Sequence, residues 1–190
     1  AELVRFAAPD GYTLIVISAS SVIHPLMYKA DYDAVRDYAA ITQLTSQPFL
    51  VVVNPGVPVK SVPELIAYAK ANPNKLNYAS AGNGSLIHLT GELFKSAAGV
   101  ELTHIPYKGI GAAYPDLIGG QIQLTFGSII SALPQVRAGR LRALAVTGPK
   151  RAKPLPDTPS VAETGVRGFA VTQWYGMQAP AKTPAPVIER

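Results

Sequence analysis

Apolar residues occur along the chain in short runs, which glycine, proline and small polar residues separate from one another. Short continuous apolar runs are typical of buried strands. The sequence predicts such strands at Tyr12–Ile17, Leu76–Ala79, Val100–Ile105, Ile122–Phe126 and Leu141–Val146. A longer run at Ala39–Val53 predicts an extended segment with a bend at Gln47-Pro48.

Between these runs the apolar positions recur every three or four residues, which predicts helices. We expect helices from Ser61 to Ala71, from about Ser85 to Gly99, over Ile110–Ile118 and over Ser131–Ala138. Pro115 means that the third helix either begins near Tyr114 or is kinked. Strands and helices therefore alternate from Val51 to Val146, which predicts an α/β fold with a parallel sheet covered on both faces.

The stretch Leu76–Gly99 combines a strand, a glycine-rich turn and a helix. The turn, Ser80–Gly84 (SAGNG), carries glycines that tolerate positive φ, and either Asn83 or Ser85 can cap the helix. Such a turn places free backbone N–H groups at the positive end of a helix dipole, which suits a carboxylate, phosphate or sulfate. The alternative is a plain connection, since similar turns recur throughout α/β folds.

Two nucleotide-binding fingerprints fail at this turn. GxGxxG is absent because Ser85, Leu86 and Ile87 follow Gly84, and no Gly-Lys-Ser/Thr follows to make a P-loop. We therefore expect no cofactor. A second candidate is Ser18-Ala19-Ser20 at the end of a predicted strand, where open α/β sheets bind ligands, although a plain loop fits equally well.

Composition narrows the function classes. The chain has 190 residues, 48% of them hydrophobic, no cysteine and a net charge of +5. Disulfides and cysteine chemistry are excluded, and the basic residues are scattered rather than arranged in a stripe with aromatic partners, which argues against nucleic acid. A mild positive charge favours small anionic ligands.

A serine hydrolase using Ser85 and His88 is one alternative, because residues three apart share a helix face. The Gly-x-Ser-x-Gly elbow is missing, no acidic partner is identifiable, and the chain has only three histidines. A second alternative is the ligand-sensing half of a transcription regulator, but no helix-turn-helix segment is present.

Six segments in order are similar to one family. They are Ala7–Leu14 (AAPDGYTL), Ser61–Gly109, Asp116–Phe126 (DLIGGQIQLTF), Ala132–Thr147, Leu155–Gly165 (LPDTPSVAETG) and Trp174–Pro184 (WYGMQAPAKTP). Together they resemble the Bug/TctC family, the periplasmic solute receptors of tripartite tricarboxylate transporters. The resemblance implies a two-lobe fold of the periplasmic-binding-protein type II, with Rossmann-like parallel-sheet lobes and a cleft that closes on a small carboxylate. It also implies a binding protein rather than an enzyme, with no cofactor and no metal.

The same resemblance implies a domain organisation. Residues 1–50 and 175–190 would be remnants of lobe 1, and residues 51–174 would be lobe 2, with hinges near Gln47–Leu50 and Thr172–Tyr175. The family's first strand and its C-terminal part have no counterpart, so we expect a family member that lacks both ends. We further expect a monomer in the periplasm, without its signal peptide, that delivers its ligand to membrane permease subunits.

The resemblance also assigns candidate binding residues. The loop that grips a ligand carboxylate in the family matches Ser80, Ala81, Gly82, Asn83, Gly84 and Ser85. His88 matches a family histidine, with helix packing as the alternative role, and Ser18, Ala19 and Ser20 match the lobe 1 loop. Gly127 and Ser128 stand where many relatives carry Asp-Asn, whose Asp can receive a ligand's ammonium group. Because an unpaired buried ammonium is costly, we predict a di- or tricarboxylate or an aromatic acid over an amino acid.

Overall fold

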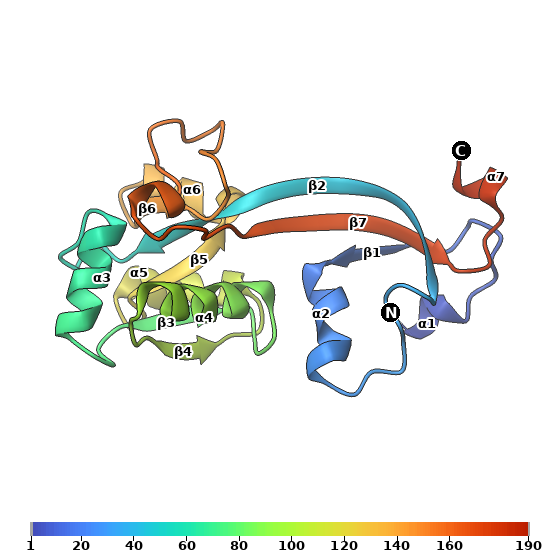
Figure 1. The fold of residues 1–190 in the computed structure, drawn as a ribbon, viewed down its shortest axis with the longest axis horizontal. Helices are drawn as coiled ribbons and strands as arrows, with labels where there is room; N and C mark the ends of the chain where they lie inside the picture. The colour runs from blue at the N-terminus through green and yellow to red at the C-terminus, as the bar shows by residue number, and fades with distance from the viewer. Residues whose placement is uncertain (1, 190) are drawn as a thin grey trace. The chain divides into compact units, whose positions relative to one another are not determined.

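A computed structural model describes residues 2–189, which form two compact units. Within the described residues, unit 1 consists of 2–46 and 173–189, and unit 2 of Gln47–Thr172. Strands β2 (Tyr38–Val53) and β7 (Thr172–Pro180) each contain a boundary between the units (Figure 1).

Unit 1 is a small sheet with short helices. Its elements are α1 (Glu2–Arg5), β1 (Ile15–Ser18), α2 (Ala19–Met27), the first part of β2, most of β7, and α7 (Ala185–Ile188). β1 pairs with β7 in the antiparallel direction, with Ile15 opposite Gln178 and Ser18 opposite Tyr175. The extended segment predicted at 39–53 is one continuous strand, since the structure assigns residues 38–53 to β2 without a break.

Unit 2 contains the alternating strands and helices that the sequence predicts. Its helices are α3 (Val62–Ala71), α4 (Leu86–Ala98), the 3-10 turn η1 (Ile110–Ala113), α5 (Tyr114–Gly119), α6 (Ile129–Arg137) and the 3-10 turn η2 (Ala162–Thr164). Its strands are the end of β2, then β3 (Asn77–Ser80), β4 (Thr103–Pro106), β5 (Leu124–Ser128) and β6 (Arg142–Val146).

The sheet of unit 2 is mixed, so the expectation of a wholly parallel sheet is wrong for one strand. Strand β3 lies parallel to both β4 and β5, whereas β2 runs antiparallel to β5 and to β6. The order across the sheet is therefore β6-β2-β5-β3-β4. A continuous apolar run indicates that both faces of a strand are buried, and it carries no information about the direction in which the strand runs.

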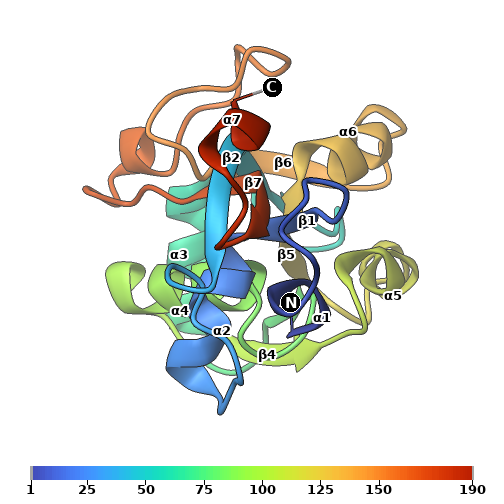
Figure 2. The same cartoon turned by 90° about the vertical axis from the view of Figure 1, so that its right-hand side faces the viewer.

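Both faces of this sheet are covered. Residues 50–53 of β2 are fully buried. Val51 and Val53 pack in one apolar cluster with residues of α3 and α4, while Leu50 and Val52 pack in a second cluster with residues of α5 and α6. Figure 2 shows α3 and α4 on one side of the strands and α5 and α6 on the other. Each fully buried side chain of this kind stabilises the fold by roughly 1.5–3 kcal/mol.

Local signals explain most helix boundaries. Ser61 accepts the backbone N–H of Glu64 and caps α3, so this helix begins where the sequence predicts. The third helix begins at Tyr114 behind a 3-10 turn, which is the first of the two alternatives that Pro115 left open. The start of α6 is two residues earlier than expected, at Ile129, because Ser128 caps it. No described helix combines the length and apolarity that crossing a membrane requires.

Candidate functional site

Two strand-to-helix junctions meet at one edge of the unit 2 sheet. Because β3 and β5 are parallel, with Ala79 opposite Thr125, both strands end at the same edge. Continuing that register brings Ala81 level with Gly127. We call residues 80–88, which lead from the end of β3 into α4, the turn junction. We call residues 127–131, where β5 passes directly into α6, the direct junction. The unit 2 residues that the sequence nominates therefore follow two strands that end at the same edge of the sheet.

The turn junction has the backbone that its glycines predict. Gly82 has φ +118° and Gly84 has φ +74°, both in the region that favours glycine. Ser85, rather than Asn83, is the N-cap: its Oγ accepts the backbone N–H of His88 at 3.3 Å. The predicted end of the helix at Gly99 is confirmed, with φ 61° in the left-handed region.

Several donors of this turn are already engaged, so the expectation of free N–H groups is wrong for three of them. Gly82 donates its N–H to Ser80 Oγ at 3.1 Å, and Gly84 donates to His88 Nδ1 at 3.1 Å. The N–H of Ser85 donates to the carbonyl of Gly82 at 3.2 Å, and Ser85 Oγ donates to that same carbonyl at 2.7 Å. These bonds hold the turn in shape, and an anion that uses these donors has to replace them.

A pair of stacked imidazoles supports the turn from the α4 side. The rings of His88 and His104 lie 4.0 Å apart between centroids and are nearly parallel, and His104 Nε2 lies 2.6 Å from Ser80 Oγ. Burial, together with the nearby His88, lowers the pKa of His104 to about 4, so this ring is neutral at pH 7. Ser80 is fully buried, which denies a substrate access to its hydroxyl despite the short contact with histidine.

Beneath the stacked pair, a tyrosine joins β3 to α4. Tyr78 Oη donates to Glu92 Oε1 at 2.7 Å, and Lys95 Nζ lies 2.9 Å from Glu92 Oε2. Burial and the bond to Glu92 raise the pKa of Tyr78. A Cβ at Gly91 would lie 2.2 Å from the Tyr78 ring, so the helix packs on the strand only because residue 91 has no side chain. This packing fixes the height of the α4 N-terminus above the sheet edge.

The direct junction is built from neutral hydroxyl groups. Ser128 caps α6 by accepting the backbone N–H of Ser131 at 3.3 Å. Ser131 Oγ lies 2.8 Å from Ser128 Oγ and 2.9 Å from Tyr114 Oη. Gly127 is buried and Ser128 is half-buried. The direct junction therefore offers hydrogen bonds at the sheet edge without a carboxylate.

The third predicted group lies in unit 1. Ser18 ends β1, and Ala19 and Ser20 begin α2. The backbone N–H of Ser18 donates to Ser21 Oγ at 3.4 Å, and Ala19 is buried while both serines are half-buried. This is again a serine between a strand and a helix, and its role in binding stays a prediction.

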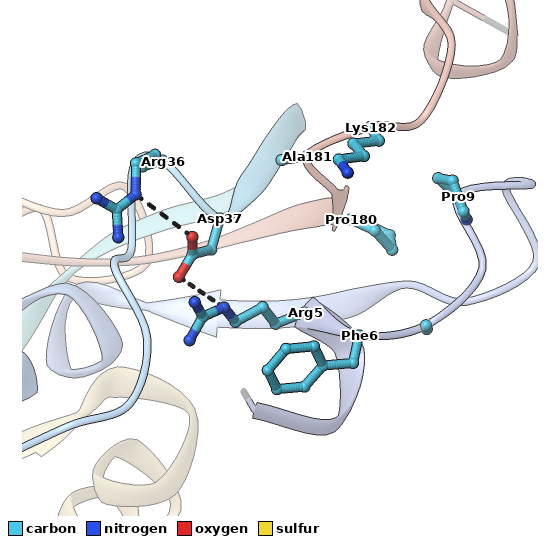
Figure 3. A pocket seen from close by; sticks show the side chains of 9 residues that line it. Arg5, Phe6, Pro9, Arg36, Asp37, Pro180, Ala181 and Lys182 are labelled. Carbon is cyan, nitrogen blue, oxygen red and sulfur yellow. Dashed lines mark ion pairs between the residues drawn. The ribbon is translucent and has the colours of Figure 1, made fainter.

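Unit 1 also contains a cavity that the sequence did not indicate. It has a volume of about 500 Å³, and Arg5, Phe6, Pro9, Arg36, Asp37 and Lys182 contribute to its lining (Figure 3). Asp37 lies between the two guanidinium groups, with Arg5 Nε at 3.0 Å and Arg36 Nε at 3.6 Å. The carboxylate offsets much of the positive charge, so the cavity is a weaker anion site than its two arginines alone indicate.

Sequence analysis missed three residues that shape the sheet edge: His104, Tyr114 and Ser131. Ser131 stands three positions after Ser128, and this N-cap spacing could have revealed it. His104 and Tyr114 reach the edge through strand pairing and helix packing, for which the sequence carries no local signal. Among residues 2–189 no group of three histidine, aspartate or glutamate side chains is placed to hold a metal ion.

Comparison with known proteins places this geometry in a class. A solved structure described as an R. palustris protein with adipate superposes with a TM-score of 0.91 at 37% identity, covering 98% of this chain and 63% of that one. MatC from Rhodopseudomonas palustris, with bound malate, superposes with a TM-score of 0.86 at 32% identity, covering 98% and 64%. The periplasmic binding protein BugD gives a TM-score of 0.87 at 36% identity, covering 98% and 62%. The fold is thus that of the two-lobe periplasmic solute-binding proteins.

Sequence comparison gives the family. The model of the tripartite tricarboxylate transporter family receptor, TctC, matches residues 1–190. A UPF0065 protein of a Pseudomonas species is 37% identical over all of this chain and 57% of its own length, and BugT of Bordetella pertussis is 34% identical over 96% and 57%. The chain belongs to the TctC family, whose members are solute-binding receptors and not enzymes, and it spans just over half the length of these relatives.

Proposed function

We propose that the protein containing this chain captures a small carboxylate in the periplasm and delivers it to the membrane permease of a tripartite tricarboxylate transporter. The observation that carries this proposal is the turn junction: glycines at positive φ lead into a serine-capped helix of 13 residues at the edge of a parallel strand pair. Such a backbone brings the positive end of a helix dipole to a negative ligand, and its N–H groups can bind that ligand once they leave their partners within the turn.

The ligand contacts follow from the arrangement of donors. A carboxylate placed over residues 81–85 can take hydrogen bonds from the backbone N–H groups and from Ser85 Oγ, provided that the engaged donors leave their partners within the turn. Gly127 and Ser128 are the neighbouring candidates in unit 2, and Ser18, Ala19 and Ser20 are the candidates in unit 1. We take unit 2 as one lobe of the receptor, and unit 1 as part of the other.

Relatives support the ligand class. One solved neighbour carries adipate and another carries malate, and both are dicarboxylates. In this chain Gly127 has no side chain, so the wall beside the turn junction supplies no carboxylate to pair with an amine. The ligand is therefore a di- or tricarboxylate or an aromatic acid rather than an amino acid. We further propose that the receptor is a monomer and that it binds this ligand without a cofactor or metal.

Thermal unfolding of the intact natural protein against a panel of ligands tests the proposal. The panel holds malate, adipate, citrate and benzoate on one side and aspartate and glutamate on the other. A ligand at 100 times its Kd adds about 2.7 kcal/mol to the free energy of unfolding, which raises Tm by several degrees. A rise with carboxylates alone supports the proposal, whereas a rise only with amino acids contradicts the ligand class, and no rise at all contradicts the function.

A further inference from the structure

Gly127 is a glycine for a steric reason. It lies inside strand β5 and is not among the glycines with positive φ, so its backbone would accept any residue. A Cβ built on Gly127 would lie 2.8 Å from Tyr114 Oη and 3.3 Å from Ala132 Cβ. Real Cβ atoms essentially never approach another heavy atom to 2.8 Å, so the Tyr114 phenol occupies the space that a side chain at residue 127 would need.

The Tyr114 hydroxyl is held in this space from two sides. Proline at residue 115 fixes the first turn of α5, and the tyrosine at the start of that helix is 9% exposed. Its Oη lies 2.9 Å from Ser131 Oγ, and Ser131 in turn donates its hydroxyl to the carbonyl of Ser128 at 3.1 Å. Either hydroxyl can donate in the bond between Tyr114 and Ser131. While the Ser131 proton serves that carbonyl, the phenol is the donor.

The bonded hydroxyls end at the proposed binding site. Tyr114 Oη is hydrogen-bonded to Ser131 Oγ, and Ser131 Oγ is hydrogen-bonded to Ser128 Oγ. Ser128 is both the last residue of β5 and the cap of α6. Burial raises the pKa of Tyr114, so the phenol stays protonated throughout the physiological range. The three groups are neutral, and no side chain projects from residue 127.

We propose that Tyr114 is the residue that sets ligand selectivity at this wall, because it fills the space of a residue 127 side chain and keeps the wall neutral. This inference rests on the proposed function and gives the structural reason for the ligand class proposed there. A carboxylate or hydroxyl group of the ligand meets hydroxyl donors at the wall, whereas an ammonium group meets no opposite charge. Tyr114 is thus a positioning residue that acts through Ser128 and through the absence of a side chain at Gly127.

Thermal unfolding of four forms of the natural protein tests the steric part: wild type, Gly127→Ala, Tyr114→Phe and the double variant. Gly127→Ala is expected to lower Tm by several degrees in the wild type and by distinctly less in the Tyr114→Phe background, because the nearest atom is then gone. Equal losses in both backgrounds would show that the phenol does not exclude a side chain, and would overturn the proposal.

Matched ligand pairs test the selectivity part. Malate and aspartate differ by a hydroxyl against an ammonium group, and adipate differs from 2-aminoadipate by the added amine. Relative to Tyr114→Phe, we expect the affinity ratio of malate to aspartate to fall at least tenfold in Tyr114→Phe/Gly127→Asp. The matched neutral control, Tyr114→Phe/Gly127→Asn, should keep the ratio of Tyr114→Phe. Wild-type protein that binds malate, with a ratio that is the same in Tyr114→Phe/Gly127→Asp as in Tyr114→Phe, contradicts this inference alone. Wild-type protein that binds no carboxylate contradicts the proposed function as well, so the two failures are distinguishable.

Discussion

The turn junction and the direct junction solve the same problem with different chemistry. Each brings a strand of the unit 2 sheet into a helix, and each helix is capped by a serine whose Oγ accepts an N–H three residues later at 3.3 Å. In the turn junction that third residue is His88, whose ring stacks on His104, and in the direct junction it is Ser131, which is bonded to Tyr114. One wall of the proposed site therefore rests on stacked imidazole rings and the other on hydrogen-bonded hydroxyl groups.

The difference extends to the backbone. The turn junction has positive φ at Gly82 and Gly84, a conformation that glycine adopts without steric cost. The direct junction passes from strand to helix with no intervening residue, since β5 ends at Ser128 and α6 begins at Ile129. In the turn junction, glycine is needed because the backbone adopts positive φ. In the direct junction, glycine is needed because a Cβ at residue 127 would clash with Tyr114. The same residue type at the same sheet edge thus has two separate physical reasons.

The largest effect is expected from Gly82→Ala, which strains the turn junction alone. Alanine at φ +118° costs about 1–3 kcal/mol and shifts the donors of the turn, so carboxylate affinity should fall at least tenfold. Gly111→Ala is the matched control, since Gly111 has no positive φ and no atom within 4 Å of its built Cβ. Calorimetric titration measures the carboxylate affinity of both variants, and equal affinities would show that the turn is not part of the binding site.

A smaller and symmetrical effect is expected from the two caps. Ser85→Ala and Ser128→Ala each remove a serine that accepts the third N–H of its helix, and each should lower the free energy of unfolding by about 1 kcal/mol. Urea unfolding measures the two losses. If Ser85→Ala costs nothing while Ser128→Ala costs the expected amount, the glycines alone hold the turn.

The last effect, no larger than that of a helix cap, concerns pH and belongs to the turn junction. The pKa of His104 is about 4 in the folded protein and about 6.5 in an unfolded chain, so the unfolded state binds more protons between these values. The contribution of neutral His104 to the free energy of unfolding is therefore fully present above about pH 6.5. It falls by about 1 kcal/mol as the pH drops toward 4, after allowance for solvent screening.

Urea unfolding between pH 4 and pH 7 measures this slope, with His104→Gln as the control that removes the titrating group and keeps a polar partner for Ser80. The control should lose part of the pH dependence of wild type. An identical slope in both proteins would assign the acid sensitivity to other groups, such as Glu92, where bonds from Tyr78 and Lys95 overcome burial and lower the pKa.

Local sequence signals predicted what depends on neighbours in the chain. The helix start at Ser61, the glycine-rich turn and the helix end at Gly99 all follow from preferences of a few consecutive residues, and the structure has them. The family resemblance placed the chain correctly among the TctC receptors. Both kinds of signal are contained in the order of residues along the chain.

Contacts between distant segments could not be predicted in this way. The antiparallel direction of β2 depends on pairing with β5 and β6, which lie more than 60 residues further along the chain. The engagement of the Gly84 N–H by His88, and the space that Tyr114 takes from residue 127, depend on side-chain rotamers and packing. Such features are set by three-dimensional neighbours, and a single sequence does not reveal them.

Amide chemical-shift mapping of the intact natural protein during a titration with adipate, and then with malate, is the most direct test of the proposed site. We expect the largest shifts at Gly82, Asn83, Gly84 and Ser85, with a second group at Gly127 and Ser128. Shifts confined to the cavity of Arg5, Arg36 and Lys182 in unit 1 would contradict the assignment of the site to the unit 2 sheet edge.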